Sequence, residues 1–330
     1  MPVRIGVIGL GVMGADHVRT LHGMVANAVV TRVTDINAER SAQLGAEIES
    51  ATVSSDGMEL INDRDVDAVI IASHDSTHAE LATACVKAGK PVLCEKPLAP
   101  TSDEAAGVVA AENGAGLISL GFNRRFDPAF AELRSVAQSG DLGAPLLVHF
   151  SHRNVESYPG ADSAFSITGS AIHEFDTVPW LLGSPIVEVS WHAPKRSGRV
   201  PEKLQDPQLM LLRTADGVLT TAETFINAAF GYDVRCEVVC ETGAVQVTKP
   251  DHTTVDVSGR RGTRYPSDWR PRFADSYRRE LQAWVGAIMS GSPTPLATAR
   301  DGLAASAVAE AVVTSMNSGG KTVTVTIPEI

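Results

Sequence analysis

Glu95, Lys96 and Pro97 follow an apolar run about a third of the way along the chain. Val92 and Leu93 in that run indicate a buried strand. A lysine at the end of such a strand costs free energy if it is buried, unless it is paired or functional. A solvated lysine in a loop is the more usual situation. The stretch therefore leaves two interpretations, a solvated loop lysine and a lysine that takes part in chemistry.

Three glycines near the N-terminus have the spacing G-x-G-x-x-G, in the string GLGVMG. The string follows an expected strand and opens an expected helix, which is the setting that a dinucleotide-binding turn requires. Such glycines permit a tight turn, a close approach of pyrophosphate to the backbone, and close packing of helix on strand. A generic strand–helix turn is the alternative. Because the helix N-terminus would face the phosphates, the predicted contacts are Gly9, Gly11, Val12, Met13 and Gly14.

Asp35 ends the second expected strand, 21 residues after Gly14. A carboxylate at this place can accept hydrogen bonds from the ribose diol of NAD. The same carboxylate repels the additional phosphate of NADP, so we predict NAD as the cofactor. Arg32 and Arg40 flank Asp35 and leave some tolerance of NADP open.

The elements that must position these residues alternate between strand and helix over residues 1–122. Expected strands are 3–8, 29–35, 68–73, 91–95 and 117–122, and expected helices are 12–24, 37–49, 77–89 and 101–112. This alternation predicts a doubly wound parallel sheet that helices cover on both faces, a Rossmann domain.

Residues 123–330 have a different pattern, in which short alternating strands are separated by turns. Helical patterns occur at about 128–139, 170–182, 275–290 and 299–316. We therefore predict an α/β protein with a second, α+β domain on a large, mostly antiparallel sheet. A chain of 330 residues is also longer than one core usually holds. The stretch 249–272, rich in Pro, Gly and charge, is expected to be loop.

Bulk composition excludes several classes of protein. The net charge of −11 argues against nucleic acid and anionic membranes as partners. No apolar run approaches the roughly 18 residues of a membrane span. The apolar N-terminus lacks the basic region and cleavage site of a signal peptide, so a cytoplasmic location is expected. The four cysteines lack a CxxC spacing, so buried thiols are expected, with no disulfide pair and no metal site.

The string GLGVMG, the segment ASHDSTHAEL at 72–81 and the segment CEKPLA at 94–99 occur together. With them the sequence resembles the glucose–fructose oxidoreductase, inositol dehydrogenase and rhizopine-catabolism (Gfo/Idh/MocA) family, over nearly the whole chain. Further segments look most like inositol dehydrogenases: GFNRRFDP (121–128), HRN (152–154), IHEFD (172–176), GYDVRCEV (231–238) and SDWRPRF (267–273). The resemblance implies a Rossmann domain over 1–122 and a substrate-binding and oligomerisation domain over 123–330.

The resemblance also implies roles for the residues that do chemistry. Lys96 would lie beside nicotinamide and substrate, and Glu95 would help to place it and line the nicotinamide pocket, so both are also cofactor-binding candidates. A cation there can stabilise the alkoxide character that develops during hydride transfer. His173 is the candidate proton acceptor, because imidazole titrates near neutral pH. A packed core histidine is the alternative, and Thr177 stands where a second zinc-binding histidine would be.

Other side chains are candidates for binding a polyhydroxylated substrate, whose hydroxyl groups all need partners once they leave water. Arg124 is favoured over Arg125, and ordinary sheet or surface polarity is the alternative for each candidate. On the cofactor side, Ser73 ends a strand and His78 follows it, although Ser76 or Thr77 could simply cap a helix and His78 could simply pack. His17 and His22 are expected to be structural or solvated. The substrate-binding candidates are Arg124, His152, Asn154, Asp176 and Tyr232.

One position departs from the family pattern. Inositol dehydrogenases commonly carry an aspartate four residues before the histidine, and here that position is Gly169. Asp176, Glu174 or Asp162 could replace it, or the pocket accepts a different substrate. The leading hypothesis is NAD-dependent oxidation of a secondary hydroxyl of a myo-inositol-like cyclitol. The alternatives are dehydrogenation of an aldose, amino sugar or aminocyclitol, and a non-catalytic dinucleotide sensor. A homo-oligomer, tetramer or dimer, is expected.

Overall fold

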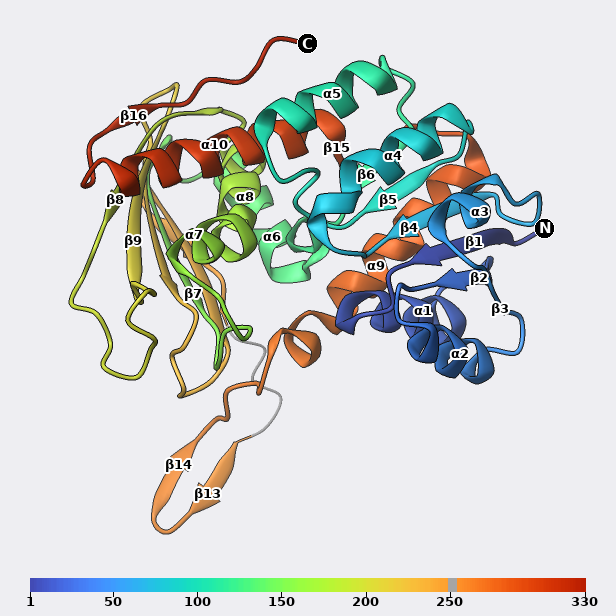
Figure 1. Ribbon diagram of the computed structural model, residues 1–330. Coiled ribbons are helices and arrows are strands. Elements are labelled where there is room, and N and C mark those ends of the chain that lie inside the picture. Colours follow the sequence, from blue (N-terminus) through green and yellow to red (C-terminus); the bar gives the residue numbers. More distant parts are fainter. Residues whose placement is uncertain (249–253) are drawn as a thin grey trace. The chain divides into compact units, whose positions relative to one another are not determined.

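The computed structural model describes residues 1–248 and 254–330, and these divide into two compact units (Figure 1). Unit 1 consists of Met1–Phe126, Asp275–Ala307 and Ile327–Ile330, and unit 2 of Asp127–Ala274 and Val308–Thr326. Each unit is built on its own seven-stranded sheet. The domain boundaries taken from the sequence, 1–122 and 123–330, stay a prediction.

The sheet of unit 1 is parallel except for one edge strand. Its order is β15-β6-β5-β4-β1-β2-β3, and only β15 pairs in the antiparallel sense, with β6. The central strands are fully buried and apolar because helices cover both faces. This is the Rossmann sheet that the alternation of strands and helices predicts. Its strands are β1 Val3–Ile8, β2 Ala28–Thr34, β3 Thr52–Val53, β4 Ala68–Ile71, β5 Val92–Cys94, β6 Ile118–Leu120 and β15 Ala297–Thr298.

Three of the helices in this unit, those that begin at Ala38, Gly57 and Ser102, have polar caps. The side chains of Asn37, Asp56 and Thr101 each accept a backbone N–H at the start of a helix. Leu281 and Trp284 of α9 join the core of the unit, far along the chain from its other members. The helical segments are α1 Val12–Met24, α2 Ala38–Glu47, α3 Gly57–Asn62, η1 Asp75–Thr77, α4 His78–Lys87, α5 Ser102–Glu112, η2 Asn123–Phe126, α9 Trp269–Ser290 and α10 Ala299–Asn317.

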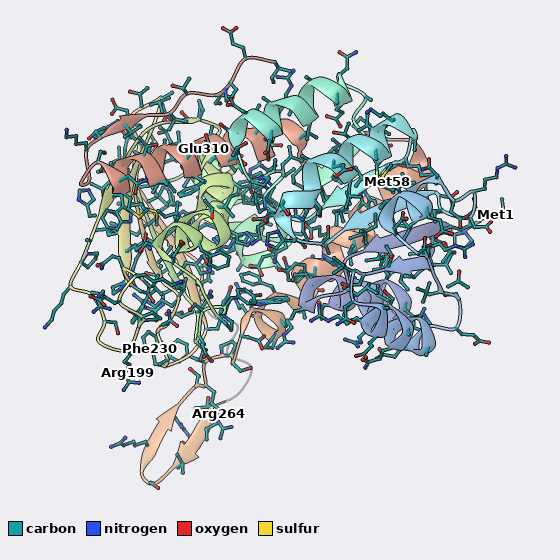
Figure 2. The ribbon with its side chains drawn as sticks, viewed as in Figure 1. Met1, Met58, Arg199, Phe230, Arg264 and Glu310 are labelled. Carbon is teal, nitrogen blue, oxygen red and sulfur yellow. The ribbon has the colours of Figure 1, made fainter. Side chains whose placement is uncertain are left out.

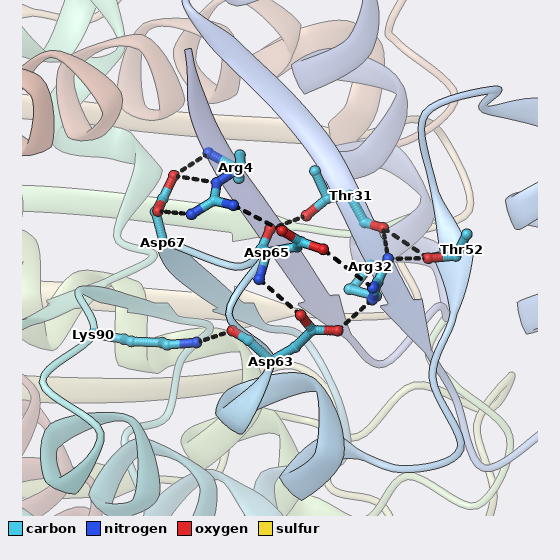
Figure 3. A network of polar contacts seen from close by, with 8 residues as sticks. All are labelled: Arg4, Thr31, Arg32, Thr52, Asp63, Asp65, Asp67 and Lys90. Atoms are coloured by element: carbon cyan, nitrogen blue, oxygen red, sulfur yellow. Dashed lines mark hydrogen bonds and ion pairs between the residues drawn. The ribbon is translucent and has the colours of Figure 1, made fainter. Parts of the chain in front are cut away.

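A network of hydrogen bonds and ion pairs between charged side chains links the beginnings of β1 and β4 in unit 1 (Figure 3). The backbone N–H of Arg4 donates to Asp67 Oδ2 at 2.9 Å, and its guanidinium donates to Asp67 Oδ1 at 2.7 Å. Arg32 Nε donates to Asp63 Oδ2 at 2.6 Å, and Lys90 Nζ donates to the Asp63 carbonyl at 2.6 Å. Arg4 and Asp67 lie where β1 and β4 begin, so the network supports the edge opposite the glycine turn.

We expect Asp67→Asn to lower the free energy of unfolding by about 0.5–1 kcal/mol at neutral pH, a value discounted for exposure. The hydrogen bonds from Arg4 hold the pKa of the Asp67 carboxyl below its usual range, against the opposing effect of burial. The contribution is present above the unfolded pKa of about 3.9 and is lost as pH falls through the lower folded pKa. Urea titrations at several pH values should show the difference vanish in acid. The exposed carboxylate Glu49, changed to Gln, is the control; an equal loss there would contradict the prediction.

The sheet of unit 2 is mostly antiparallel, as the sequence predicts. Its order is β12-β11-β7-β10-β9-β8-β16, and β7 with β10 is the parallel pair. Residues alternate between buried and half-buried along β7 and β10, so one face is covered. The strands are β7 Pro145–Arg153, β8 Ile186–His192, β9 Gln208–Thr214, β10 Leu219–Phe225, β11 Asp233–Cys240, β12 Ala244–Gln246 and β16 Val323–Thr324. The helical segments before β8 are α6 Pro128–Gln138, α7 Ser163–Phe165, η3 Ser166–Ala171 and α8 Ile172–Leu182.

The expectation of loop over 249–272 was wrong in part. Strand β13 (Val255–Val257) pairs with β14 (Arg260–Gly262), and 249–253 lie outside the described residues. The two turn residues, Ser258 and Gly259, both have positive φ, which is the backbone of a two-residue hairpin turn. The half-exposed side chain of Phe230 is labelled in Figure 2. It packs edge-on against Tyr265, with ring centroids 5.8 Å apart.

All four cysteines are free and buried, which confirms the expectation of buried thiols. Burial raises the pKa of Cys85 to about 12, so this thiol stays protonated at neutral pH. In the part of the chain that the structure describes, no helix has the length and apolarity needed to cross a membrane.

Candidate functional site

The glycine turn after β1 requires glycine at two positions and leaves space at the third. Gly9 has φ +87°, and a Cβ there would lie 2.4 Å from Ser73 N. A Cβ on Gly14 would lie 1.8 Å from Gly9 O, whereas a Cβ on Gly11 would meet no atom within 4 Å. The open side of the turn is therefore at Gly11, where a pyrophosphate would approach.

Helix α1 begins directly after this turn, at Val12 and Met13. No side chain caps its N-terminus at Gly11. Its first N–H groups are therefore available to a phosphate, which the positive end of the helix also attracts. These observations fit the dinucleotide contacts predicted for this loop.

Asp35 lies beside the same turn, just past the end of β2. Its Oδ2 accepts the N–H of Leu10 at 2.6 Å, and its Oδ1 accepts the N–H of Asn37 at 2.7 Å. Both bonds fix the carboxylate, and each oxygen keeps lone-pair capacity for a ribose hydroxyl. This geometry is compatible with a ribose-binding acid, and that role of Asp35 stays a prediction.

We expect Asp35→Asn to reduce the preference for NAD over NADP by about tenfold or more. The charged carboxylate repels a second phosphate by about 1–4 kcal/mol at contact distance, depending on the local dielectric. The ratio of kcat/KM for NAD to kcat/KM for NADP measures this preference. A weakened bond to the Leu10 N–H affects both cofactors and cancels in the ratio, whereas the loss of the carboxylate charge affects NADP selectively. A wild-type enzyme that clearly prefers NADP would contradict the assignment.

Glu95 and Lys96 lie directly after β5, at the carboxyl edge of the sheet, and the Lys96–Pro97 peptide bond is cis. Glu95 is buried and Lys96 is half-buried. Glu95 Oε1 accepts the Nε2–H of His17 at 2.8 Å, from a fully buried imidazole on α1. Burial would raise the pKa of Glu95, but the His17 hydrogen bond and the charges of His17 and Lys96 hold it below its usual range. Lys96 therefore has an ionised carboxylate beside it.

The sequence did not predict the contact of His17 with Glu95. The sequence indicates that His17 is structural or solvated. The structure shows that it is buried, but its hydrogen bond to Glu95 was not predicted. A signal was present, because His17 lies three residues after Gly14 and so on the same helix face. That face packs against the sheet, where Gly14 touches the backbone of Gly9.

Ser73 and His78 lie beside the Lys96 turn. The ring nitrogens of His78 lie 2.6 Å from Pro97 O and 3.1 Å from Ser73 O. Ser73 Oγ lies 2.7 Å from Thr77 Oγ1. These contacts favour the alternative in which His78 holds the backbone of the turn, while its direct role toward the cofactor stays a prediction.

The two arginines of η2 differ in their surroundings. Arg125 Nη2 lies 3.3 Å from Asp301 Oδ1, an ion pair that helps lower the pKa of Asp301 against the opposing effect of burial. Arg124 is 2% exposed and is one of the largest fully buried side chains. The preference for Arg124 over Arg125 as a substrate-binding residue stays a prediction.

In unit 2, three of the predicted residues come together from three elements. The ring of His152 on β7 lies 6.3 Å from that of His173 on α8 and 6.4 Å from that of Tyr232, just before β11. His152 Nδ1 also lies 3.3 Å from the buried carboxylate of Glu174. The cluster thus places two imidazoles and a phenol side by side, groups that can bind hydroxyls and accept a proton.

Asp176 lies on α8 with His173, and Asn154 directly follows β7, which carries His152. Asp176 is 2% exposed and lies three residues after His173, on one turn of α8. The backbone of Asn154 is held by bonds to Phe225 and Ala228, and its side-chain Oδ1 is buried without a hydrogen-bond partner. An unsatisfied buried oxygen is costly, so a bound hydroxyl group would be a favourable partner.

Gly169 lies in η3, one turn before His173, and the ring of Phe165 lies beside it. A Cβ on Gly169 would lie 3.0 Å from the ring of Phe165. Phe165 packs edge-on against Tyr158, with centroids 6.0 Å apart, and against a small apolar cluster that includes Leu204. A side chain at this position would therefore require the Phe165 ring to shift by a few tenths of an ångström.

The fold and the glycine turn together define a dinucleotide-binding oxidoreductase. Residues 3–122 match the oxidoreductase family, NAD-binding Rossmann fold, and residues 138–325 match the C-terminal alpha/beta domain of the same family. The chain belongs to the Gfo/Idh/MocA oxidoreductase family, as the sequence motifs indicate, and its predicted cofactor, NAD, is confirmed by the family domain.

Individual relatives are similar over the whole length. The chain is 52% identical to inositol 2-dehydrogenase 2 of Paenarthrobacter aurescens, over 98% of each chain. It is 48% identical to inositol 2-dehydrogenase 2 of Saccharopolyspora erythraea, over 97% of this chain and 94% of the relative. The crystal structure of myo-inositol dehydrogenase from Lactobacillus casei with NAD(H) and myo-inositol has a TM-score of 0.96 and 31% identity, covering 100% of this chain and 98% of that one.

Proposed function

We propose that this protein is an NAD-dependent dehydrogenase that oxidises a secondary hydroxyl of a myo-inositol-like cyclitol to the ketone. The observation that carries the proposal is Lys96, half-buried beside an ionised Glu95 at the carboxyl edge of an NAD-binding sheet. Full-length similarity to inositol dehydrogenases supports the substrate class. The polar cluster of His152, His173 and Tyr232 supports it independently, because it can satisfy several hydroxyls.

In this proposal the catalytic residues have separate roles. NAD, when bound at the glycine turn, supplies a hydride acceptor. Lys96 donates a hydrogen bond to the reacting oxygen and stabilises its developing negative charge. His173 accepts the hydroxyl proton, and Asp176, His152, Asn154, Tyr232 and Arg124 are the proposed substrate-binding groups.

A screen of NADH formation across cyclitols, aldoses, amino sugars and aminocyclitols tests the proposal. Cyclitols should give the highest kcat/KM. A clear preference for an aldose or an aminocyclitol would show that the substrate is of that class and not a cyclitol. Glycine in place of the family's aspartate at position 169 is the observation that favours this second outcome. Saturable NADH binding without turnover of any polyol would instead support the sensor.

We also propose a cytoplasmic homo-oligomer, most simply a tetramer. The support is the face of the unit 2 sheet that carries half-buried apolar residues, including Leu209 and Leu211 of β9. A second copy of the chain would cover such a face. Light scattering at working concentration should give a multiple of 34.8 kDa, and a mass at that single value would contradict the proposal.

A further inference from the structure

His17 and Glu95 form a buried pair between two elements of unit 1 that are far apart in sequence. The 2.8 Å bond joins α1, which begins at the glycine turn, to the residue before Lys96. His17 is 0% exposed and Glu95 is 6% exposed. The ring of His17 is held in turn by Tyr277 of α9, edge-on at 5.8 Å.

The carboxylate of Glu95 has little freedom to move away from this bond. On its other side, a Cβ on Gly121 would lie 3.0 Å from Glu95 Cδ, so the backbone after β6 closes the site. Glu95 Oε2 also accepts the backbone N–H of Lys96 at 3.3 Å. The carboxylate therefore connects the α1 helix directly to the start of the Lys96 turn.

The groups around Glu95 keep it ionised. The titratable groups that act on the carboxylate include His17 from α1, with Lys96 and Cys94 from its own segment. Burial raises the pKa of the Cys94 thiol well above its usual value, so Cys94 adds no charge at neutral pH. Burial opposes ionisation of Glu95 as well, and the hydrogen bond from His17 is the strongest effect that counters it.

We propose that His17 is a positioning residue, which fixes Glu95 as an anion and through it the location of the Lys96 ammonium. This inference rests on the proposed function of Lys96. Imidazole suits the task because Nε2–H donates to Glu95 while the ring body fills an apolar site against Tyr277. Loss of the donor leaves a buried carboxylate that protonates at higher pH, and Lys96 then lacks the charge beside it.

The test compares three variants of the full chain. His17→Phe removes the donor and keeps a ring, His17→Gln keeps an N–H near the same place, and Glu95→Gln removes the charge. His17→Phe should lower kcat roughly ten- to hundredfold, the range of a hydrogen bond to a charged group. NAD affinity should change little, and His17→Gln should recover most of the turnover. His22→Phe, an exposed histidine on the same helix, is the matched control and should behave as wild type.

Two further readouts separate positioning from a general loss of structure. The kcat/KM profile of His17→Phe should show a new loss of activity on the acid side, absent from wild type and from His17→Gln. The effects of His17→Phe and Glu95→Gln should not add in the double variant, because both act through one contact. Additive losses, or a wild-type profile in His17→Phe, would overturn the proposal.

A measurement that needs no substrate tests the role of His17 separately from the proposed function. Infrared difference spectra between about pH 5 and pH 8 should show a protonated carboxyl band in His17→Phe that disappears when Glu95 is also changed to Gln. If wild type oxidises no polyol, the proposed function fails, while the band still decides whether His17 ionises Glu95. If His17→Phe does not fold, His17→Asn, whose shorter amide cannot reach Glu95, takes its place. Absence of the band would refute the role of His17.

Discussion

Replacement of Lys96 by alanine should reduce kcat by about 10²–10³-fold and leave NAD affinity largely unchanged. The expected size is that of one positioned donor lost from a developing oxyanion. The structure adds a reason for the donor's efficiency, because Glu95 beside it is buried and ionised. An ammonium next to a fixed carboxylate has less freedom than a lysine in open solvent, so less reorganisation is needed when charge develops on the substrate.

Single-turnover kinetics with the preferred polyol measure this effect, together with NADH binding followed by fluorescence. Lys87→Ala is the matched control, since Lys87 is an exposed lysine at the end of α4 in the same unit. Its turnover should equal that of wild type. Unchanged turnover in Lys96→Ala would return Lys96 to the solvated-loop interpretation.

Much of the fold could be predicted because its signals are local. The fully apolar β4, Ala68–Ile71, has the composition of a strand buried on both faces, and the glycine turn after β1 has a fixed spacing. The hairpin over 255–262 was missed because each strand is only three residues long. Val255 and Val257 alternate with Asp256, but β14 (Arg260–Gly262) has no apolar side chain to extend the pattern. The turn of the hairpin, Ser258-Gly259, is a recognisable hairpin signal, although a short one.

The site was less predictable, because its key contacts join residues that are distant in sequence. His17 and Glu95 are 78 positions apart, and only the packing of α1 beside β5 brings them together. The cluster of His152, His173 and Tyr232 also draws on three separate elements. A motif identifies such residues one at a time, whereas their burial and partners depend on tertiary structure.

At Gly169, the neighbouring ring of Phe165, which lies outside the motif, changes a prediction made from the sequence. The sequence suggests that Gly169→Asp would restore a family carboxylate and improve activity on myo-inositol. The backbone permits this change, because Gly169 lies in a helical segment and has no positive φ. The ring of Phe165, however, lies 3.0 Å from the position of the new Cβ. The single variant must therefore shift the Phe165 ring by a few tenths of an ångström, against its contacts with Tyr158 and the apolar cluster around Leu204.

We therefore expect Gly169→Asp by itself to gain little on myo-inositol, and Phe165→Val/Gly169→Asp to raise kcat/KM by about 10- to 100-fold. This range corresponds to a hydrogen bond to a charged group, about 1.5–3 kcal/mol. Phe165→Val/Gly169→Ala opens the same space without the carboxylate and is the matched control; it should show no gain. Thermal melting must accompany the kinetics, because removal of part of the Phe165 ring costs packing energy. The expectation fails if wild type already oxidises myo-inositol efficiently and the folded double variant is no better. A gain in the Ala control would instead assign the effect to space rather than charge, and the pocket would then be limited by the bulk of Phe165.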